Sequence, residues 1–246
     1  MTKDGRPSPL KDIRLFHETA NAYLKDCDEA WAFGRRLAWW LNGEGFSAGS
    51  GFAVYIQFTA ALPEGAVAPG EINRDRDSWQ MRQVAVGVAR DFPASNAAQV
   101  VMDGIVASLK ALAPEHSDLI DRAAAIVAAA GADCRFLLKS KETSAQVMDV
   151  SSTIATWPQP SRLFVSLTDK ATGLYRQAPP VEMRNYDDAV LLAGKVKIVR
   201  GDVNLAARSS SPAKMTADRH GGDLSWRLED FVQTERPRMS SPLKFR

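Results

Sequence analysis

Four neighbouring residues combine the side chains that dominate binding surfaces: Arg35, Arg36, Trp39 and Trp40. Tryptophan and arginine carry much of the binding energy at protein interfaces, and they also stack on bases and contact phosphates. Successive residues of a helix are about 100° apart, so in a straight helix we expect one of the two tryptophans to be only partly covered. Packing beneath neighbouring strands is the favoured interpretation, and a partner-binding surface is the functional one.

Basic residues concentrate near the C-terminus. The last 53 residues hold 11 Lys or Arg and six Asp or Glu, a net charge of +5, so the preceding part of the chain carries −3. Because nucleic-acid affinity depends on Lys and Arg that neutralise phosphates, this asymmetry suits an anionic partner. The candidates for contact with an anion or a nucleic acid are Lys195, Lys197, Arg200 and Arg208. A solvated basic tail is the alternative.

Metal-binding patterns are weak. Asp75 and Asp77, in the charged loop 71–78, could offer oxygen ligands to a divalent cation, which keeps an enzyme with a metal or carboxylate site as one alternative function. A solvated loop with local ion pairs explains the same residues. His17, His116 and His220 are far apart, and none has the partner four residues away that helical zinc motifs use. The sequence therefore predicts no metal site.

One catalytic motif is matched by residue types but not by the expected secondary structure. Residues 45–49 read Gly-Phe-Ser-Ala-Gly, but a nucleophile elbow needs a strand before the serine and a helix after it. Here we expect the reverse order, so a flexible turn is the better interpretation. No glycine-rich phosphate motif follows a predicted strand. We therefore predict no catalytic residue and no cofactor, and we favour a protein that is not an enzyme.

Composition is that of an ordinary globular chain: 246 residues, 45% hydrophobic and 24% charged, with a net charge of only +2. That balance excludes a uniformly basic surface. The longest apolar run, residues 123–130, is far shorter than the ~18 residues of a membrane span, so we expect no membrane contact. No secretory signal is visible at the start. Cys27 and Cys134 have no second cysteine nearby, and a reducing cytoplasm is the expected compartment.

Periodicity predicts the elements that must position these side chains. In the first half we expect a long helix over 10–41, a strand over 52–62, an exposed connection over 63–78, an antiparallel partner strand over 79–90 and an αα-hairpin ending at Gly131. In the strand over 52–62, Val54, Ile56 and Phe58 alternate with Tyr55, Gln57 and Thr59, which predicts one buried face.

The second half is predicted as shorter elements. We expect a buried strand over 134–139, a helix over 144–156, a hairpin formed by 163–168 and 173–177, a helix over 185–192 and a strand over 195–200. A mobile tract over 208–222 and a helical segment over 223–232 follow. Trp157-Pro158-Gln159-Pro160 is the strongest interruption in the chain, because proline pushes the preceding residue toward extended geometry.

Together these elements predict an α+β protein with a mainly antiparallel sheet, a long N-terminal helix and an αα-hairpin. The expected organisation is a flexible tail over 1–9, a body over 10–156, a second α+β subdomain or continuation of the sheet over 161–232, and a flexible basic tail over 233–246. The predicted function is that of a non-catalytic, cytoplasmic binding or regulatory protein that occupies a surface of a macromolecular partner. We expect the partner to be another protein, with a nucleic acid as the alternative, and we predict no particular oligomeric state.

Overall fold

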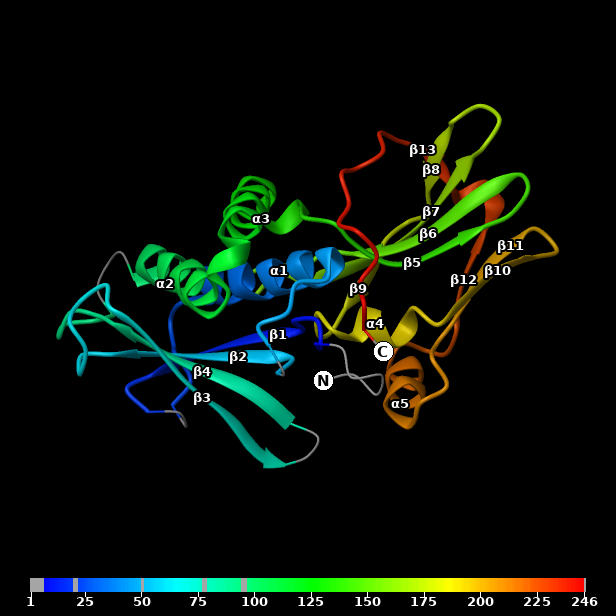
Figure 1. The fold of residues 1–246 in the computed structure, drawn as a ribbon. Coiled ribbons are helices and arrows are strands. Elements are labelled where there is room, and N and C mark those ends of the chain that lie inside the picture. The colour runs from blue at the N-terminus through cyan, green and yellow to red at the C-terminus, as the bar shows by residue number, and fades with distance from the viewer. Residues whose placement is uncertain (1–6, 20–21, 50, 77–78, 94–96, 246) are drawn as a thin grey trace. The chain divides into compact units, whose positions relative to one another are not determined.

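The computed structural model describes residues 7–19, 22–49, 51–76, 79–93 and 97–245. For residues 72–76 and 79–80 it describes the backbone alone. In this part of the chain five α-helices and three β-sheets form an α+β protein (Figure 1). The chain divides into two compact units. Unit 1 ends at Gly131, and unit 2 comprises Ala132–Phe245.

Unit 1 contains a four-stranded sheet and three α-helices. The strands are β1 (Asp12–His17), β2 (Ala53–Thr59), β3 (Val67–Arg76) and β4 (Trp79–Gly87), in the spatial order β1-β2-β4-β3. The helices are α1 (Asp28–Glu44), α2 (Ala97–Leu112) and α3 (Ser117–Ala130). β1 is parallel to β2 and β2 is parallel to β4, whereas β3 is antiparallel to β4. The predicted antiparallel pairing of the second and fourth strands is therefore wrong, because the β3 hairpin strand lies between them in sequence.

The predicted long helix over 10–41 is not confirmed. Its first part is β1, in which Ile13 and Leu15 are buried on one side of the sheet. Glu18 and Asp26 follow, each with a positive φ that a right-handed helix cannot contain. α1 begins only at Asp28. Helical spacing misled the interpretation because Ile13 and Phe16, three residues apart, lie on opposite faces of a strand.

Residues 63–78, expected to be an exposed connection, contain β3. As an edge strand β3 tolerates Pro69 and a polar sequence, because only one of its sides must pair with a neighbour. Its pairing with β4 shifts register between Pro69 and Ile72 and again between Asn73 and Arg76. Such irregularities are common at sheet edges.

All three helices lie on the same side of the unit 1 sheet (Figure 1). α1 contacts β1, α2 and α3, and α2 contacts β2, β3 and β4. Ile56, Phe58, Val84 and Val86 are buried on this side. The predicted αα-hairpin is not confirmed, because α2 and the segment Pro114–Asp133 are bent by 117° and do not run antiparallel. No single helix of the described residues is long and apolar enough to cross a membrane, although these two pass that test as a bent pair.

Unit 2 contains two antiparallel sheets. The six-stranded sheet comprises β5 (Phe136–Glu142), β6 (Gln146–Ser152), β7 (Ser161–Asp169), β8 (Tyr175–Gln177), β9 (Val181–Met183) and β13 (Val232–Gln233), in the order β13-β8-β7-β6-β5 with β9 paired to β7. The three-stranded sheet comprises β10 (Lys195–Val199), β11 (Asp202–Ala206) and β12 (Leu224–Arg227). The two short helices are α4 (Asp188–Leu192) and α5 (Ser211–Arg219).

The proline-rich stretch does not separate the units. It joins β6 to β7, which pair along their whole length up to Ser152 and Leu163. β6 and β7 are neighbours in one sheet, which agrees with the alternative that residues 161–232 continue the sheet. The observed division lies at Gly131, where the helices of unit 1 end.

Several other predictions in unit 2 have clear outcomes. The hairpin of β7 and β8 and the helix α4 are confirmed. The predicted helix over 144–156 is wrong, because this segment contains β6. The tract 208–222, expected to be mobile, contains α5, whose first turn is capped by the Ser210 side chain. His220 is buried beside α5, with its Nε2 3.2 Å from Oδ2 of Asp188 at the start of α4. The helical segment expected over 223–232 contains β12 instead, followed by one turn of 3₁₀ helix.

The C-terminal segment, expected to be a flexible basic tail, crosses the six-stranded sheet. Gln233 ends β13 at one edge, and Met239 bridges to Arg135 at the opposite edge, beside β5. The two edges are four strand spacings apart, about 19 Å, and the six residues from Gln233 to Met239 span about 20 Å when extended. The segment is therefore just long enough to cross the sheet. On the way, Arg236 lies 3.5 Å from Asp149. We call residues 234–240 the strap.

Gly104 lies where α2 packs closely against the sheet. A Cβ at this position would lie 2.7 Å from the ring of the fully buried Phe58. We predict that Gly104→Ala lowers stability by about 1–2 kcal/mol, because overpacking outweighs the ~1 kcal/mol of helix propensity that alanine gains. Gly34→Ala in α1 is the matched control, since its Cβ would meet the terminal methyl of Ile105 at 3.3 Å and Ile13 at an ordinary contact distance of 3.6 Å. Urea unfolding measures both. A Gly104→Ala protein as stable as Gly34→Ala would contradict this packing.

Candidate functional site

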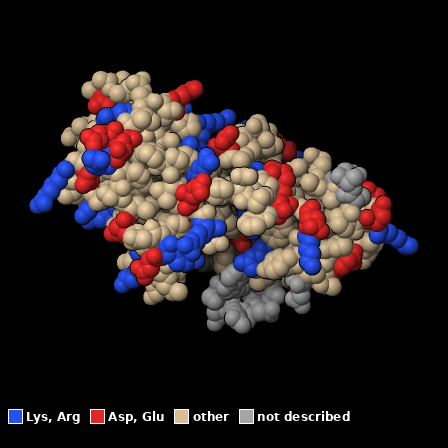
Figure 2. Space-filling model, turned by 180° about the vertical axis from the view of Figure 1, so that it is seen from behind, with Lys and Arg blue, Asp and Glu red and all other residues tan. Residues whose placement is uncertain are grey.

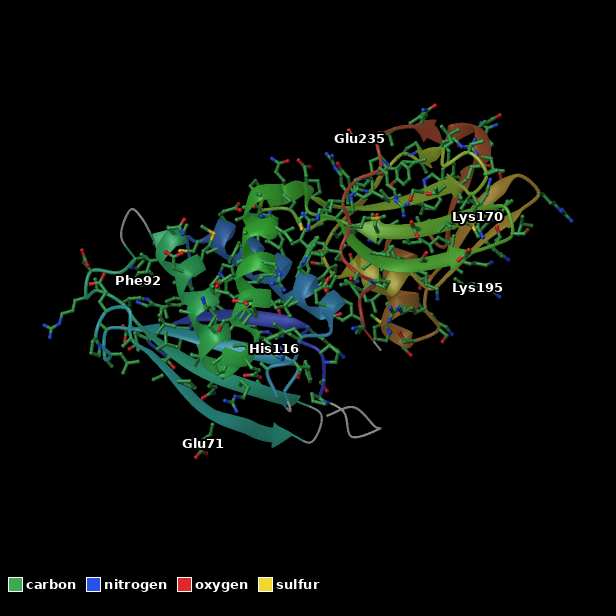
Figure 3. All side chains as sticks on the ribbon, turned by 45° about the horizontal axis from the view of Figure 1, so that its top comes forward. Glu71, Phe92, His116, Lys170, Lys195 and Glu235 are labelled. Atoms are coloured by element: carbon green, nitrogen blue, oxygen red, sulfur yellow. The ribbon has the colours of Figure 1, made fainter. Side chains whose placement is uncertain are left out.

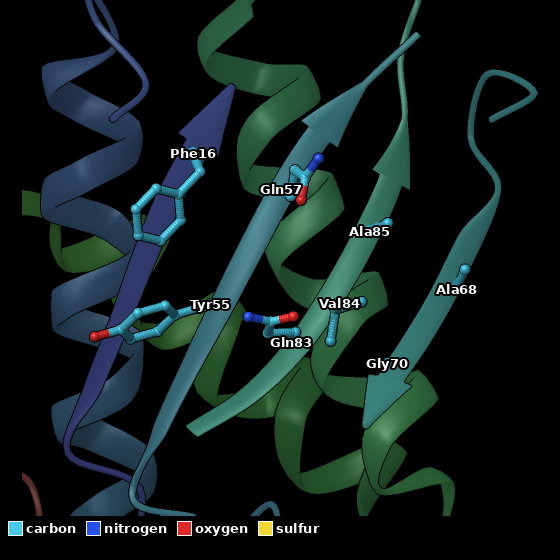
Figure 4. A pocket seen from close by; sticks show the side chains of 8 residues that line it. All are labelled: Phe16, Tyr55, Gln57, Ala68, Gly70, Gln83, Val84 and Ala85. Atoms are coloured by element: carbon cyan, nitrogen blue, oxygen red, sulfur yellow. The ribbon is translucent and has the colours of Figure 1, made fainter. Parts of the chain in front are cut away.

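One face of the unit 1 sheet carries no helix of the described residues. Strand residues point alternately to the two faces, so the residues between the buried ones face away from α1, α2 and α3. Two cross-strand rows lie there, and we call them the open face: Arg14, Tyr55 and Gln83 in one row, and Phe16, Gln57 and Ala85 in the next. Figure 4 shows five of these side chains, those of Phe16, Tyr55, Gln57, Gln83 and Ala85, in front of the sheet and the helices behind it.

A pocket of about 120 Å³ lies in the open face. Its lining comprises Phe16, Tyr55, Gln57, Ala68, Gly70, Gln83, Val84 and Ala85 (Figure 4). The small residues are on β3 and β4, and the two rings are on β1 and β2. The pocket exists because a low surface of alanine and glycine adjoins a taller surface of aromatic and glutamine side chains.

The aromatic wall of the pocket is held by contacts on its far side. The ring of Phe16 lies 5.0 Å from that of Tyr23, in a stacked arrangement, and 5.2 Å from that of Tyr55. Phe16 is therefore only 4% exposed although no helix covers it, while Tyr23 is 53% exposed. The Arg14 guanidinium lies 5.4 Å from the centre of the Tyr55 ring and pairs with Asp12 at 2.8 Å. Ring positions fixed in this way form a preorganised surface.

Glu18 anchors the turn that follows β1. Its backbone has a φ of 58°, and its carbonyl oxygen accepts a hydrogen bond of 2.6 Å from Gln57 Nε2. Its carboxylate accepts hydrogen bonds from the Ala60 amide at 3.0 Å and the Thr59 hydroxyl at 3.1 Å. The Ala60 amide above all lowers the pKa of Glu18. This anchor orients Gln57, one wall of the pocket.

Two polar groups of the open face remain available. The Gln83 amide and the Tyr55 hydroxyl make no hydrogen bond to any described residue. Partial burial raises the pKa of the Tyr55 phenol, so it stays a protonated donor at neutral pH. The pocket thus offers two aromatic rings, a hydroxyl and an amide. It can hold a flat or apolar group and form hydrogen bonds to a polar edge of that group.

The four residues predicted as a partner-binding surface lie on α1, and three of them are buried. Arg36 is 1% exposed, Trp39 2% and Trp40 6%, so the expectation that one tryptophan is only partly covered is wrong. β1, α2 and α3 surround α1, so positions 100° apart on the helix are both covered. Arg35 is half-exposed, with its guanidinium 5.3 Å from the Trp31 ring centre.

The four predicted anion-binding residues do not form one cluster. Lys195 and Lys197 are exposed at alternate positions of β10, and Arg200 lies in the turn that follows (Figure 3 labels Lys195). Arg208 is separate: it is half-buried, it donates to the Phe245 carbonyl oxygen at 3.3 Å, and desolvation lowers its pKa. Lys141 of β5, which the sequence interpretation missed, donates to the Val196 carbonyl oxygen of β10 at 3.2 Å.

The candidates for catalysis have separate outcomes. Asp77 and the side chain of Asp75 lie outside the described part of the chain. Among the described residues no group of three His, Cys, Asp or Glu could hold a metal ion. Ser47 follows α1 and precedes β2, which confirms the order opposite to that of a nucleophile elbow, and its hydroxyl donates to the Gly49 carbonyl oxygen. Cys27 and Cys134 are buried thiols that form no disulfide.

The chain matches no protein-family model, no curated protein and no solved structure. The open face must therefore be interpreted from its own chemistry. Sequence reasoning missed its residues, although the alternation of Tyr55 and Gln57 with buried neighbours was a usable signal. Phe16 had no such signal once β1 was interpreted as part of a helix.

The Glu18 anchor makes a pH-dependent contribution to stability. Because its pKa is lowered in the folded protein, the contribution is present above the unfolded value of about 4.3 and is lost as the pH falls through the folded value. We predict that Glu18→Gln flattens the dependence of Tm on pH between about pH 5 and pH 3. The control is Glu64→Gln, at an exposed glutamate before β3. An NMR titration that placed the Glu18 pKa at or above about 4.3 would contradict the anchor.

Proposed function

We propose that the protein is a binding protein that holds another protein on the open face of unit 1. The observation that carries the proposal is the pocket between the aromatic wall and the small residues of β3 and β4. We propose that it works in the cytoplasm, where thiols such as Cys27 and Cys134 remain reduced.

The size of the pocket favours a single side chain of a partner as its occupant. Pockets for whole small molecules measure roughly 300–1,000 Å³, several times the 120 Å³ found here. An aromatic or branched apolar side chain fits that volume and contacts Phe16 and Tyr55. The Gln83 amide and the Tyr55 hydroxyl can then bind backbone groups of the same segment.

Charge favours a protein over a nucleic acid at this face. Residues 1–131 hold 13 Lys or Arg and 16 Asp or Glu, a net charge of −3. Arg14, the basic residue of the open face, is already paired with Asp12. Nucleic-acid binding depends on basic side chains that neutralise phosphates, and the open face offers little free positive charge. A protein segment can bind without such basic side chains.

Filling the pocket tests the proposal. Peptides selected by phage display against the full-length protein should share an aromatic or branched apolar residue, and their affinities can be measured by fluorescence anisotropy. We predict that Ala85→Leu weakens them about tenfold or more, because the larger side chain occupies the pocket. Ala128→Leu, the same change at an exposed position of α3, should have no effect. Peptides that bind Ala85→Leu as well as the unmodified protein would refute the proposal.

A second candidate function is nucleic-acid binding by unit 2. Lys195, Lys197 and Arg200 lie on one hairpin, and Lys141 joins them from β5. The net charge of +5 in the last 53 residues favours this candidate. Against it, basic and acidic side chains are interspersed over the molecular face in Figure 2.

Salt dependence tests this second candidate. Filter binding of single-stranded DNA should weaken as salt rises, and replacing Lys195, Lys197 and Arg200 by Gln should reduce the slope of log K against log salt by about 2. Replacing Lys110, which is ion-paired to Asp121 in unit 1, is the control and should change nothing. Absence of any salt-dependent affinity in the unmodified protein would exclude this function.

A further inference from the structure

A polar row crosses one face of the six-stranded sheet in unit 2. Ser140 of β5 lies opposite Asp149 of β6, Asp149 opposite Ser166 of β7, and Ser166 opposite Gln177 of β8. Asp149 and Ser166 are almost completely buried. Polar side chains at such positions normally find hydrogen-bond partners, because an unsatisfied buried group costs about 1–3 kcal/mol.

Arg135 lies over this face without an acidic partner. Its guanidinium carbon is 3.3 Å from the centre of the Phe164 ring, and Nη1 donates to Gln177 Oε1 at 3.2 Å. A longer contact of 3.5 Å reaches the Ser151 hydroxyl. Its Nε is buried without a partner, and no described carboxylate lies within ion-pair distance. Desolvation lowers the pKa of Arg135, and Tyr175 and Asp133 offset that effect only in part.

Three hydroxyls beside Arg135 also lack partners. Ser166 Oγ, Thr168 Oγ1 and Tyr175 Oη are buried and make no hydrogen bond to any described residue. Ser166 is 1% exposed and Tyr175 5%. The register places all three on the face that carries Gln177, because Ser166 pairs with Gln177 and Thr168 with Tyr175. These three hydroxyls can therefore donate hydrogen bonds that no described residue accepts.

We propose that Arg135, Ser166 and Tyr175 bind an oxyanion, either a phosphate or a carboxylate group of a small molecule. A guanidinium presents a planar fork of donors that matches such a group, and hydroxyls donate to its remaining oxygens. The anion would supply the missing counter-charge and the missing acceptors together. This site is independent of the open face of unit 1.

The strap places a positive charge beside Asp149, the acidic residue of the polar row. Asp149 lies in the same row, but Ser140 donates to its Oδ1 at 2.6 Å and Arg236 of the strap lies 3.5 Å from its Oδ2. Its negative charge is thus neutralised. Arg135 and Gln177 are half-buried, so this part of the site is reachable from solvent.

Anion titrations of the full-length protein test the site. Inorganic phosphate and citrate are added separately, and binding is measured by isothermal titration calorimetry and by the rise in Tm. We expect at least one probe to bind, and the comparison shows whether phosphate or carboxylate is preferred. Arg135→Gln should weaken that binding about tenfold or more, and Ser166→Ala should weaken it several-fold.

Matched variants keep the test decisive. Arg227→Gln removes an exposed arginine from β12 and should bind as the unmodified protein does. Arg135→Lys keeps the charge but loses the fork, so it should retain only part of the affinity; circular dichroism checks that each variant is folded. No binding of either probe at 10 mM, or equal binding by Arg135→Gln and Arg227→Gln, would overturn the proposal.

Discussion

Parallel pairing of β1 with β2 and of β2 with β4 is the constraint on which the open face depends. Parallel neighbours need a crossover connection, and α1 provides it between β1 and β2. α2 and α3 pack on the same side as α1. The opposite side of the sheet carries the side chains of the open face. Since the side-chain period of a strand is two, a slip of one residue would bury Tyr55 and Gln57 and expose Ile56.

The two units offer different binding chemistry. In unit 1 the charges of the open face cancel within it, because Arg14 pairs with Asp12, and the available groups are rings, an amide and a hydroxyl. In unit 2 the charges are not balanced, because Arg135 is desolvated and no described carboxylate lies within ion-pair distance of it. One surface therefore suits an uncharged segment of a protein, and the other suits an anion.

Sequence reasoning succeeded where the local pattern and the final environment agree. The alternation in β2 and the turn between β7 and β8 are local signals, and both elements form as predicted. β1 and β6 were misassigned because their spacing of apolar residues also fits a helix, and only pairing with distant strands decides between the two. The strap has no local signal, since its place depends on Arg135 and Asp149, roughly 90 to 100 residues earlier in the chain.

The candidate site was harder to predict than the fold. The pocket needs Phe16, Gln57 and Ala85 in one row, and these residues come from three strands that are adjacent only after a helix and a hairpin intervene. Arg36, Trp39 and Trp40 attracted attention by residue type, but their surroundings on α1 bury them. Residue type indicates what a side chain can do, whereas exposure depends on contacts that the sequence pattern does not contain.

Side-chain amide resonances report on the central claim most directly. Gln57 and Gln83 lie in the pocket, whereas Gln99 lies on α2 and Gln146 lies in unit 2. In ¹⁵N-correlated NMR spectra of the full-length protein with a selected peptide, the account predicts that the amide signals of Gln57 and Gln83 shift while those of Gln99 and Gln146 stay in place. Shifts confined to Gln99 or Gln146, with Gln57 and Gln83 unchanged, would contradict it.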